Sequence, residues 1–465
     1  MSQPHIEALA WAEPHPFWSD QRSGPDAEDT LVRTEHTDLC IVGGGYTGLW
    51  TAILAKERDP SRDVVLIEGD TCGSGASGRN GGFMEASLTH GVANGQQHFP
   101  SEVAQLERLG FENLDAIEDT ISRYNIDCAF ERTGVIDVVT YEPYLDEIVE
   151  DHRQLRSLGQ EVELLDREQM QAQVHSPTYI GGLWRKDRAA LVDPVRLAWG
   201  LKRAALALGV RVYEHTKATG IERDGVGVLV KTPFGSVRAA RVALATNAYP
   251  PLLRQMKNYI VPVYDYCMAT EPLSSEQLDS IGWAGRQGLS DTNNQFHYYR
   301  LTEDNRIIWG GYDAVYFFGS KHAGELDQRP ETFMKLSEHF FTTFPQLEGL
   351  HWENAWGGAI DTCTRFCVFW GTSMRGRVAY AAGYTGLGVA STRFGGQIML
   401  DLLHGRRNEV TDLEFVRRKP LPWPPEPFRF VGIQLSKHSL DREDKTGKRN
   451  LWLRSLDRLG LGFDS

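Results

Sequence analysis

The chain has 465 residues, of which 41% are apolar and 24% charged, an ordinary composition for a globular protein. This length exceeds what one hydrophobic core supports, so we expect two domains or a discontinuous pair. The formal net charge of −13 argues against a nucleic-acid-binding surface, which needs a net basic face.

The first twenty residues show no secretory signal, and no apolar run is long enough for a membrane-spanning helix. The six cysteines are scattered, as in proteins that keep reduced thiols, so we expect a cytoplasmic location. Cys363 and Cys367 are separated by three residues, which is neither a redox pair nor a zinc pattern. We therefore expect two ordinary thiols and no metal site.

Residues 1–30 have no clear periodicity and are expected to form an extended arm on the body of the protein. A short apolar run at 38–42 then ends in glycines, which is typical of a buried parallel strand. The pattern predicts a helix over 46–57 and a second buried strand over 63–68. Together they form a βαβ unit, which is right-handed in nearly all proteins.

Further along the chain, helices are predicted over 102–124 and 143–158, with a strand over 134–139 between them. A second α/β passage follows, with a helix over 194–208, a strand over 210–213, a β-meander over 220–238 and an apolar strand over 242–246. Residues 257–350 look mostly like strands, with a helix near 330–344. An apolar strand over 378–382 leads through a glycine turn into a helix over 389–403.

The tail is rich in proline over 420–427, and residues 451–461 form an amphipathic stretch. Proline cannot continue a helix or a central strand. We expect the tail to wrap around the body or around a partner subunit.

The turn after the first strand satisfies the GxGxxG pattern at Gly43, Gly45 and Gly48. The first glycine allows a tight turn, the second lets a pyrophosphate approach the backbone, and the third allows close packing of helix on strand. The N-terminus of the helix offers free N–H groups to the phosphates. Glu68 ends the next strand, where an acid can accept hydrogen bonds from ribose hydroxyls. This context predicts a dinucleotide site.

Two further glycine-rich segments favour FAD as the dinucleotide. Residues 72–82 form a loop of small residues with one cation, Arg79, which suits passage around a pyrophosphate and the edge of a flavin. Residues 383–388 lie between a buried strand and a helix. The N-terminus of that helix would place partial positive charge where negative charge develops on a reduced flavin.

These glycine segments, together with residues 245–249, resemble the glycine and D-amino-acid oxidase (DAO) family of FAD-dependent oxidoreductases. The resemblance is closest to the gamma-glutamylputrescine oxidase-like branch, which shares stretches similar to 261–263, 269–273, 298–300, 309–311 and 356–358. The similar stretches occur in a consistent order over roughly residues 37–405.

The resemblance implies a Rossmann-type FAD-binding domain with an interleaved α+β substrate domain built on a large mixed or antiparallel sheet. The FAD-binding domain would take residues 31–84, 155–250 and 355–410, and the substrate domain 85–154 and 251–354. An arm over 1–30 and an extension over 411–465 would lie outside the family core.

The resemblance also implies non-covalent FAD, with a covalent link through Cys363 or Cys367 as the less favoured alternative. The implied cofactor contacts are Gly43, Gly45, Tyr46, Thr47, Gly48, Glu68, Gly69, Gly75, Ala76, Ser77, Arg79, Asn80, Gly81, Gly82, Ala218, Ala245, Thr246, Gly383, Thr385, Gly386, Leu387, Gly388 and Val389. The candidates for the substrate pocket are Tyr299, Arg300, Trp356 and Tyr384. For Arg300, pairing with a substrate carboxylate and a purely structural role are equally open.

The implied reaction is oxidation of the C–N bond of an amine or amino acid by hydride transfer to flavin N5, giving an imine that hydrolyses. No obligatory catalytic side chain is expected, because the cofactor carries the chemistry. Sarcosine-oxidase-like relatives carry a lysine on the strand that corresponds to 307–309, and this chain has none there. Oxygen and another electron acceptor, such as a quinone or a protein, therefore both remain open. A non-catalytic FAD-binding subunit is the alternative from a different class, and the oligomeric state is not specified.

Overall fold

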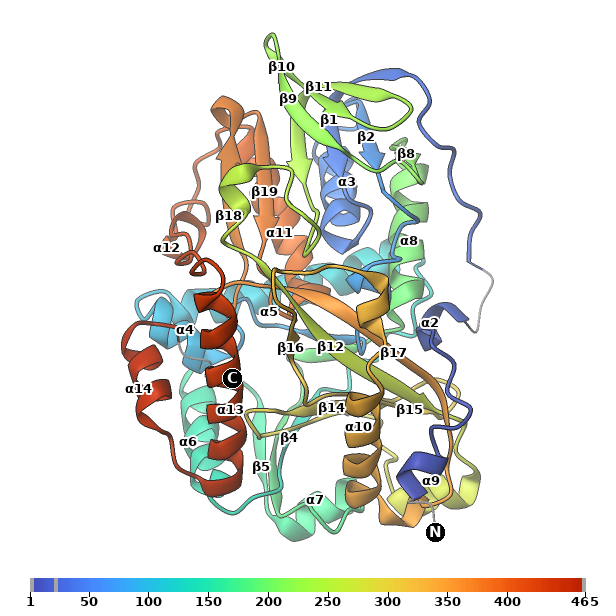
Figure 1. The fold of residues 1–465 in the computed structure, drawn as a ribbon, viewed down its shortest axis with the longest axis vertical. Helices are drawn as coiled ribbons and strands as arrows, with labels where there is room; N and C mark the ends of the chain where they lie inside the picture. The colour runs from blue at the N-terminus through green and yellow to red at the C-terminus, as the bar shows by residue number, and fades with distance from the viewer. Residues whose placement is uncertain (1–3, 21–23, 462–465) are drawn as a thin grey trace.

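One of the two large sheets is built around the predicted βαβ unit, in the upper half of Figure 1. The computed structural model describes residues 4–20 and 24–461. The strands of this sheet are β1 (Thr34–Val42), β2 (Val64–Ile67), β8 (Arg211–Tyr213), β9 (Gly220–Asp224), β10 (Gly227–Lys231), β11 (Ser236–Leu244), β18 (Phe369–Ser373) and β19 (Val378–Ala382). Strands β19, β11, β1, β2 and β8 run parallel in that order, while β18, β10 and β9 are antiparallel additions.

The two faces of this sheet are covered differently, as the alternation along β1 requires. Leu39 and Ile41 pack toward the helices α3 (Tyr46–Arg58), α8 (Pro194–Ala207) and α11 (Gly388–Leu403). Cys40 and Val42 pack on the other face, against the ribbon of β9, β10 and β11. Both faces of the parallel core are therefore buried, which explains its continuous apolar strands.

The second large sheet, in the lower half of Figure 1, is mixed and has nine strands among the described residues. They are β4 (Val135–Val139), β5 (Val162–Leu165), β6 (Gly181–Arg185), β12 (Val261–Thr270), β13 (Gly288–Asp291), β14 (His297–Leu301), β15 (Ile307–Gly311), β16 (Val315–Tyr316) and β17 (Trp352–Thr362). Helix α10 (Pro330–Thr343) packs through Phe333, Leu336 and Phe340 on one face of this sheet. The other face is turned toward the first sheet.

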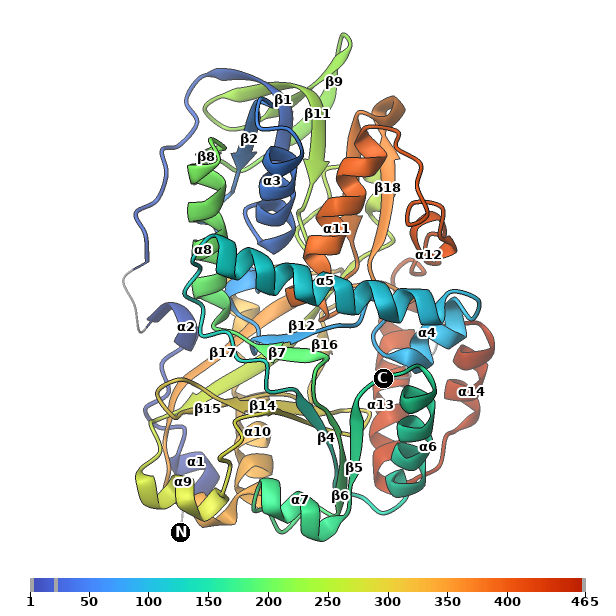
Figure 2. The same cartoon turned by 180° about the vertical axis from the view of Figure 1, so that it is seen from behind.

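The remaining elements connect and flank the two sheets (Figure 2). They are β3 (Phe83–Glu85), β7 (Ala189–Leu191), α4 (Val92–His98), α5 (Val103–Arg123), α6 (Tyr144–Ser157), α7 (Arg167–Gln173), α9 (Ser275–Ile281) and α12 (Glu414–Arg417). Strands β3 and β7 pair with each other, and the long helix α5 packs against α11.

Both ends of the described chain lie on the body. The N-terminal arm was expected to be extended, but it contains two short helices, α1 (Pro4–Glu7) and α2 (Phe17–Asp20). The C-terminal extension folds back as α13 (Phe428–Thr446) and α14 (Leu451–Arg458), which lie beside α6 and α4 in both views (Figures 1 and 2). Residues 1–3 and 462–465, which belong to the expected arm and extension, lie outside the described residues.

The predicted elements agree with the structure at most positions, with a second correction besides the helices of the arm. The expected meander over 220–238 and the separate strand over 242–246 are wrong in their division, because β11 runs unbroken from Ser236 to Leu244. Its first half pairs with β10 and its whole length pairs with β1, so both ladders hold the same strand. The proposed domain ranges stay a prediction. Strands β5 and β6 were expected in the FAD-binding domain, but they pair into the nine-stranded sheet.

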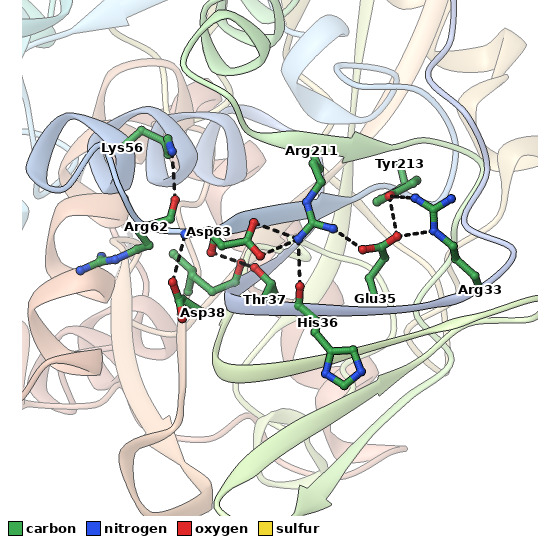
Figure 3. Close-up of polar contacts among 11 residues, drawn as sticks. Arg33, Glu35, His36, Thr37, Asp38, Lys56, Arg62, Asp63, Arg211 and Tyr213 are labelled. Atoms are coloured by element: carbon green, nitrogen blue, oxygen red, sulfur yellow. Dashed lines mark hydrogen bonds and ion pairs between the residues drawn. The ribbon is translucent and has the colours of Figure 1, made fainter.

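A charged network closes the end of the first sheet that lies away from the glycine turn (Figure 3). Arg211 on β8 donates from Nη2 to both carboxylate oxygens of Asp63, at 2.8 and 2.7 Å, and to the carbonyl of His36 at 2.9 Å. Its Nη1 also pairs with Glu35 on β1. One guanidinium therefore joins β8, β1 and the start of β2.

We expect the variant Arg211→Leu to lower the free energy of unfolding by about 1–2 kcal/mol, because it removes a partly exposed guanidinium that pairs with both Asp63 and Glu35. Thermal unfolding followed by circular dichroism measures the change. Lys231→Leu, which removes the exposed pair with Glu222, is the control and should have no measurable effect. Equal stability of both variants would refute a structural role for this network.

Candidate active site

The glycine turn between β1 and α3 has the close contacts that the motif predicts. Gly43 has a φ of 112°, and a Cβ there would lie 2.3 Å from the carbonyl oxygen of Ala245. A Cβ on Gly48 would lie 1.8 Å from the carbonyl oxygen of Gly43. Helix α3 begins at Tyr46 after Gly45, which has no side chain that could cap the helix. The turn therefore offers backbone N–H groups of the helix N-terminus to an anion.

Glu68 lies directly beyond β2, beside this turn. Its carboxylate accepts hydrogen bonds from the N–H groups of Gly44, at 2.6 Å, and Asp70, at 2.9 Å. These bonds fix the side chain at the edge of the sheet where parallel strands of α/β proteins bind nucleotides.

The loop over 72–82 crosses in front of the turn and contacts both sheets. Ser77 Oγ accepts a hydrogen bond from the N–H of Tyr46 at 2.9 Å. Arg79 donates to Asp327 at 2.5 Å and to the carbonyl of Gly357 on β17 at 3.2 Å. A Cβ on Gly81 would lie 2.6 Å from the ring of Tyr298, so this glycine permits close contact with β14.

The turn over 383–388 is held by Asp361, a buried carboxylate at the end of β17. It accepts hydrogen bonds from the N–H groups of Gly383, at 2.6 Å, and Tyr384, at 3.1 Å. Burial raises the pKa of Asp361 to about 7. Helix α11 follows this turn, and its N-terminus at Leu387 also has no side-chain cap. A second helix N-terminus thus lies in the same region.

A cavity of about 2480 Å³ extends between the two sheets and connects these segments. The predicted cofactor residues that line it are Gly43, Gly45, Tyr46, Thr47, Glu68, Gly69, Gly75, Ala76, Ser77, Arg79, Asn80, Gly81, Ala218, Ala245, Thr246, Thr385, Gly386, Leu387, Gly388 and Val389. Gly48, Gly82 and Gly383 do not line it. These three glycines instead permit close backbone packing behind the lining.

The four substrate-pocket candidates divide into two pairs. Trp356 and Tyr384 line the cavity, and Trp356 Nε1 donates to the carbonyl of Arg79 at 2.8 Å. Tyr299 does not line it, because its ring is buried in the core against Trp309 and its hydroxyl bonds that of Tyr179. Arg300 does not line it either: its side chain is 1% exposed and donates to the carbonyl of Val192 at 2.7 Å. Of the two roles left open for Arg300, the contacts favour the structural one.

The structure brings other residues to the cavity that were not predicted from the sequence. Asp265 and Cys267 on β12 and Tyr298 on β14 line it, as does His90, whose Nε2 lies 3.1 Å from the carbonyl of Thr385. Tyr298 donates to Asp265 Oδ2 at 2.6 Å. Burial raises the pKa of Asp265 to about 6, and the bond from Tyr298 opposes that rise. Within residues 4–20 and 24–461, no cationic side chain forms an ion pair with Asp265.

The cavity lining suits a large polar cofactor such as a dinucleotide. The N-termini of α3 and α11, where the N-cap residue makes no side-chain cap, provide N–H donors, and the glycines of the first turn allow the close packing that brings α3 to the cavity. Asn247 also lines the cavity, and its Oδ1 has no hydrogen-bond partner in the described structure. A buried oxygen without a partner is rare in a native protein and indicates that something else bonds it.

Comparison with known proteins decides the family. The family model described as FAD dependent oxidoreductase (DAO) matches residues 38–402, which is more than half of the chain. The chain belongs to this family. Its cofactor is therefore FAD, and the predictions of the family, of the cofactor and of an FAD-dependent oxidoreductase are confirmed.

Relatives and solved structures agree with this assignment. The gamma-glutamylputrescine oxidoreductase of Escherichia coli is 32% identical over 399 residues, covering 85% of this chain and 90% of the relative. A probable oxidoreductase, OrdL, of Haemophilus influenzae is 30% identical over 407 residues, covering 86% and 90%. The crystal structure of glycine oxidase from Geobacillus kaustophilus has a TM-score of 0.69 at 20% identity and covers 83% of this chain and 99% of that one. The structural similarity confirms the expected fold of the FAD-dependent family.

The family match ends before the C-terminal extension, and it begins after the N-terminal arm. Leu440 of the C-terminal extension nevertheless lines the cavity, and Trp18 of the N-terminal arm donates a hydrogen bond to the carbonyl of Asn80. In the described part of the chain, no helix is long and apolar enough to cross a membrane.

Proposed function

We propose that this protein oxidises the C–N bond of an elongated amine, with FAD bound along the glycine turn, the 72–82 loop and the 383–388 turn. When bound, FAD accepts a hydride equivalent from the carbon next to the substrate nitrogen. The observation that carries the proposal is Asp265, a half-buried carboxylate in the cavity wall that forms no ion pair among the described residues.

Asp265 lies on the wall that meets the 72–82 loop. It pairs in register with Gly358 on β17, and a Cβ on Gly358 would lie 3.6 Å from the side chain of Arg79. Tyr298, which donates to Asp265, packs on Gly81 of the same loop. A substrate ammonium at this place would neutralise the carboxylate and donate charge-assisted hydrogen bonds to it.

The chemistry assigns two roles to Asp265. Its carboxylate orients the substrate nitrogen, and it accepts the proton that an ammonium must lose before the neighbouring C–H bond yields its hydride. Loss of one proton from nitrogen and one hydride from carbon forms the C=N bond. Water then hydrolyses this product to an aldehyde or ketone, releasing ammonia from a primary amine or the smaller amine from a secondary one. Tyr298 keeps the carboxylate in place through its 2.6 Å bond.

The shape of the cavity supports a long substrate. One cross-strand row runs through Trp356, Cys267, Gly310, Tyr298, Ser290, Asp137 and Leu183. Every residue of this row except Gly310 lines the cavity. From Cys267 to Asp137 the row crosses four strand spacings, or about 19 Å. That distance equals about five residues of extended chain, so a single small amino acid would occupy a minor part of it.

The far end of this row is charged. Asp137 accepts two hydrogen bonds from Arg185, at 2.8 and 2.9 Å, and Glu85 accepts a third at 3.0 Å. All three residues line the cavity. This end suits a polar or zwitterionic group of the substrate, at a fixed distance from the reacting amine.

The C-terminal extension covers the same end. Leu440 and Glu443 of α13 and Trp452 of α14 line the cavity there. Asp444 fastens α13, because its carboxylate accepts hydrogen bonds from the hydroxyl of Tyr144 and from backbone and side-chain N–H groups of the 294–295 segment, at 2.8–3.0 Å. The extension therefore limits which amines the cavity admits.

The Escherichia coli relative bears the name of gamma-glutamylputrescine, a diamine chain that carries an amino-acid head. We propose a compound of this shape as the substrate class here, with the free amine at Asp265 and the head at the far end. The six cysteines are all unpaired and buried, which supports the proposal of a cytoplasmic location.

We expect gamma-glutamylputrescine to reduce the flavin of the purified protein at least about 100-fold more efficiently than glycine, a difference of about 2.7 kcal/mol. Anaerobic stopped-flow absorption of the flavin, with putrescine as the amine of intermediate length, measures the series. Faster reduction by glycine would overturn the elongated substrate class, and a flavin that none of a wide panel of amines reduces would favour a non-catalytic subunit. Admitting air, and separately a quinone, then identifies the electron acceptor.

A further inference from the structure

The N-terminal arm places two aromatic side chains between the 72–82 loop and the nine-stranded sheet. Phe17 and Trp18 of α2 are only 6% and 3% exposed, and they pack with Val195, Ile308 and Trp356. The arm lies outside residues 38–402, which match the family model. Such burial is unusual for a terminal segment, so its contacts have a purpose beyond covering the surface.

Trp18 holds the loop by a direct hydrogen bond. Its Nε1 donates to the carbonyl of Asn80 at 2.9 Å, and Trp356 Nε1 donates to the adjacent carbonyl of Arg79 at 2.8 Å. Two indoles, one from the arm and one from β17, therefore bind neighbouring carbonyls of the loop. Trp18 does not line the cavity, so it acts only through the loop.

Asn80 transmits this contact to the rest of the loop. Its side-chain amide donates to the carbonyls of Ala76 and Ser77, at 3.0 and 3.1 Å, and its Oδ1 accepts from the N–H of Gly82 at 2.9 Å. Ser77 in turn binds the N–H of Tyr46 at the first turn of α3. Asn80 therefore links three other residues of the loop by hydrogen bonds, and its own carbonyl is bound by Trp18.

Arg300 supports the arm and the loop from below. Its guanidinium carbon lies 5.9 Å from the centre of the Trp18 ring, within the range of a cation–π contact. Its Nη1 donates to the carbonyls of Val192, at 2.7 Å, and Gly82, at 3.4 Å. Burial lowers the pKa of Arg300 to about 10, and no carboxylate in the described structure forms an ion pair with it. Arg300 is therefore a cation dedicated to backbone carbonyls and to the Trp18 ring.

We infer that the N-terminal arm is a clamp for the cofactor loop, in which Trp18 is a positioning residue that holds residues 76–82 in the conformation that receives FAD. The inference rests on the proposed cofactor contacts of this loop. Without the clamp the loop populates other conformations in the apoprotein, and the apparent affinity for FAD falls by the fraction that remains competent.

The variant Trp18→Phe keeps most of the buried ring and removes the N–H donor. We expect its apoprotein to bind FAD about fivefold to tenfold more weakly than the wild type, the factor that one lost neutral hydrogen bond gives. Titration of apoprotein with FAD, followed by flavin fluorescence, measures the dissociation constant. Thermal unfolding with and without excess FAD is the second readout, and the midpoint should fall more in the presence of FAD than in its absence.

Two control variants separate the clamp from general packing. Phe17→Leu trims the neighbouring side chain, which has no hydrogen bond to the loop, and should lower both unfolding midpoints equally with an unchanged dissociation constant. Trp11→Phe alters an indole that is 76% exposed and should change neither. A dissociation constant for Trp18→Phe within twofold of the wild type overturns the clamp. A wild-type apoprotein that does not bind FAD overturns the proposed cofactor site instead.

A measurement on the wild-type protein keeps the inference testable if Trp18→Phe does not fold. Coupling between two sites is reciprocal, so FAD must stabilise the arm if the arm stabilises FAD binding. Hydrogen exchange should therefore show that amides of residues 17–20 and 76–82 gain protection together when FAD is added. Protection that rises in the loop alone would refute the clamp.

Discussion

The variant Asp265→Asn is expected to lower kcat/KM for the amine substrate by about 1000-fold, while the protein keeps its full content of FAD. An amide cannot accept the proton of the substrate ammonium and does not neutralise its charge, and a general base alone contributes about 10²–10⁴ in rate. The cofactor should remain, because the turns at 43–48 and 383–388 are unchanged.

Steady-state kinetics and the visible spectrum of the flavin measure the two quantities. Asp224→Asn, which changes a surface carboxylate paired with Arg238, is the matched control and should leave kcat/KM unchanged. Tyr298→Phe keeps the Asp265 carboxylate and removes its 2.6 Å bond, so we expect a smaller loss of about tenfold. An Asp265→Asn enzyme within tenfold of the wild type would show that this carboxylate does not handle the substrate.

The pH profile follows from the same residue. Burial raises the pKa of Asp265 to about 6, so its carboxyl is protonated below that pH and ionised above it. Only the ionised form binds an ammonium and accepts its proton. In the free enzyme kcat/KM should therefore fall tenfold per pH unit below about 6, and this acidic limb should be absent in Asp265→Asn.

The glycine-rich side of the cavity was largely predictable from the sequence, because its requirements are local. A strand, a tight glycine turn and a helix must be adjacent in the chain, and the spacing from Gly48 to Glu68 identifies the next strand. The structure places both ends of this pattern at the cavity or directly behind it. Backbone conformation and close packing determine this side of the cavity, and both requirements are visible in the sequence as glycines at fixed spacing.

The substrate side was not predictable in the same way, because strand parity and distant contacts determine it. Neighbouring residues of a strand point to opposite faces, so Tyr298 and Tyr299 cannot both reach the cavity. In the structure Tyr298 lines the cavity and Tyr299 is buried in the core. No local sequence signal distinguishes the two residues. Arg300 shares the parity of Tyr298, but Trp18 from the arm covers it. Asp265 lies within an apolar strand, and only the strand order brings it to the 72–82 loop.

The C-terminal extension shows a third source of error. Its prolines and amphipathic pattern predicted a segment that wraps around the body, and α13 and α14 do lie against α6 and α4 (Figure 2). No pattern in the sequence indicated that Leu440 and Trp452 would line the cavity. Contacts between a terminal extension and residues far away in the chain depend on the whole fold, and so they follow from no local pattern.

The second large effect is expected at the glycine turn, where Gly48→Ala should weaken FAD binding by at least about 100-fold and also lower stability by about 1–3 kcal/mol. A Cβ on Gly48 would lie 1.8 Å from the carbonyl oxygen of Gly43 and 3.3 Å from Ile41. Both contacts are with β1 and its turn, so the helix α3 must move away from the strand. That movement displaces the helix N–H groups that we propose receive the pyrophosphate.

Two glycine variants make this prediction specific. In Gly45→Ala the new Cβ would lie 2.9 Å from Ser77 Oγ, at the cavity and away from the helix–strand contact. This variant should bind FAD weakly with an unchanged unfolding midpoint of the apoprotein, which keeps the test valid if Gly48→Ala does not fold. Gly324→Ala, with no atom within 4 Å of the added Cβ, should match the wild type in both measurements. If Gly48→Ala and Gly45→Ala both bind FAD with a dissociation constant within twofold of the wild type, the turn does not hold the pyrophosphate and the cofactor must lie elsewhere in the cavity.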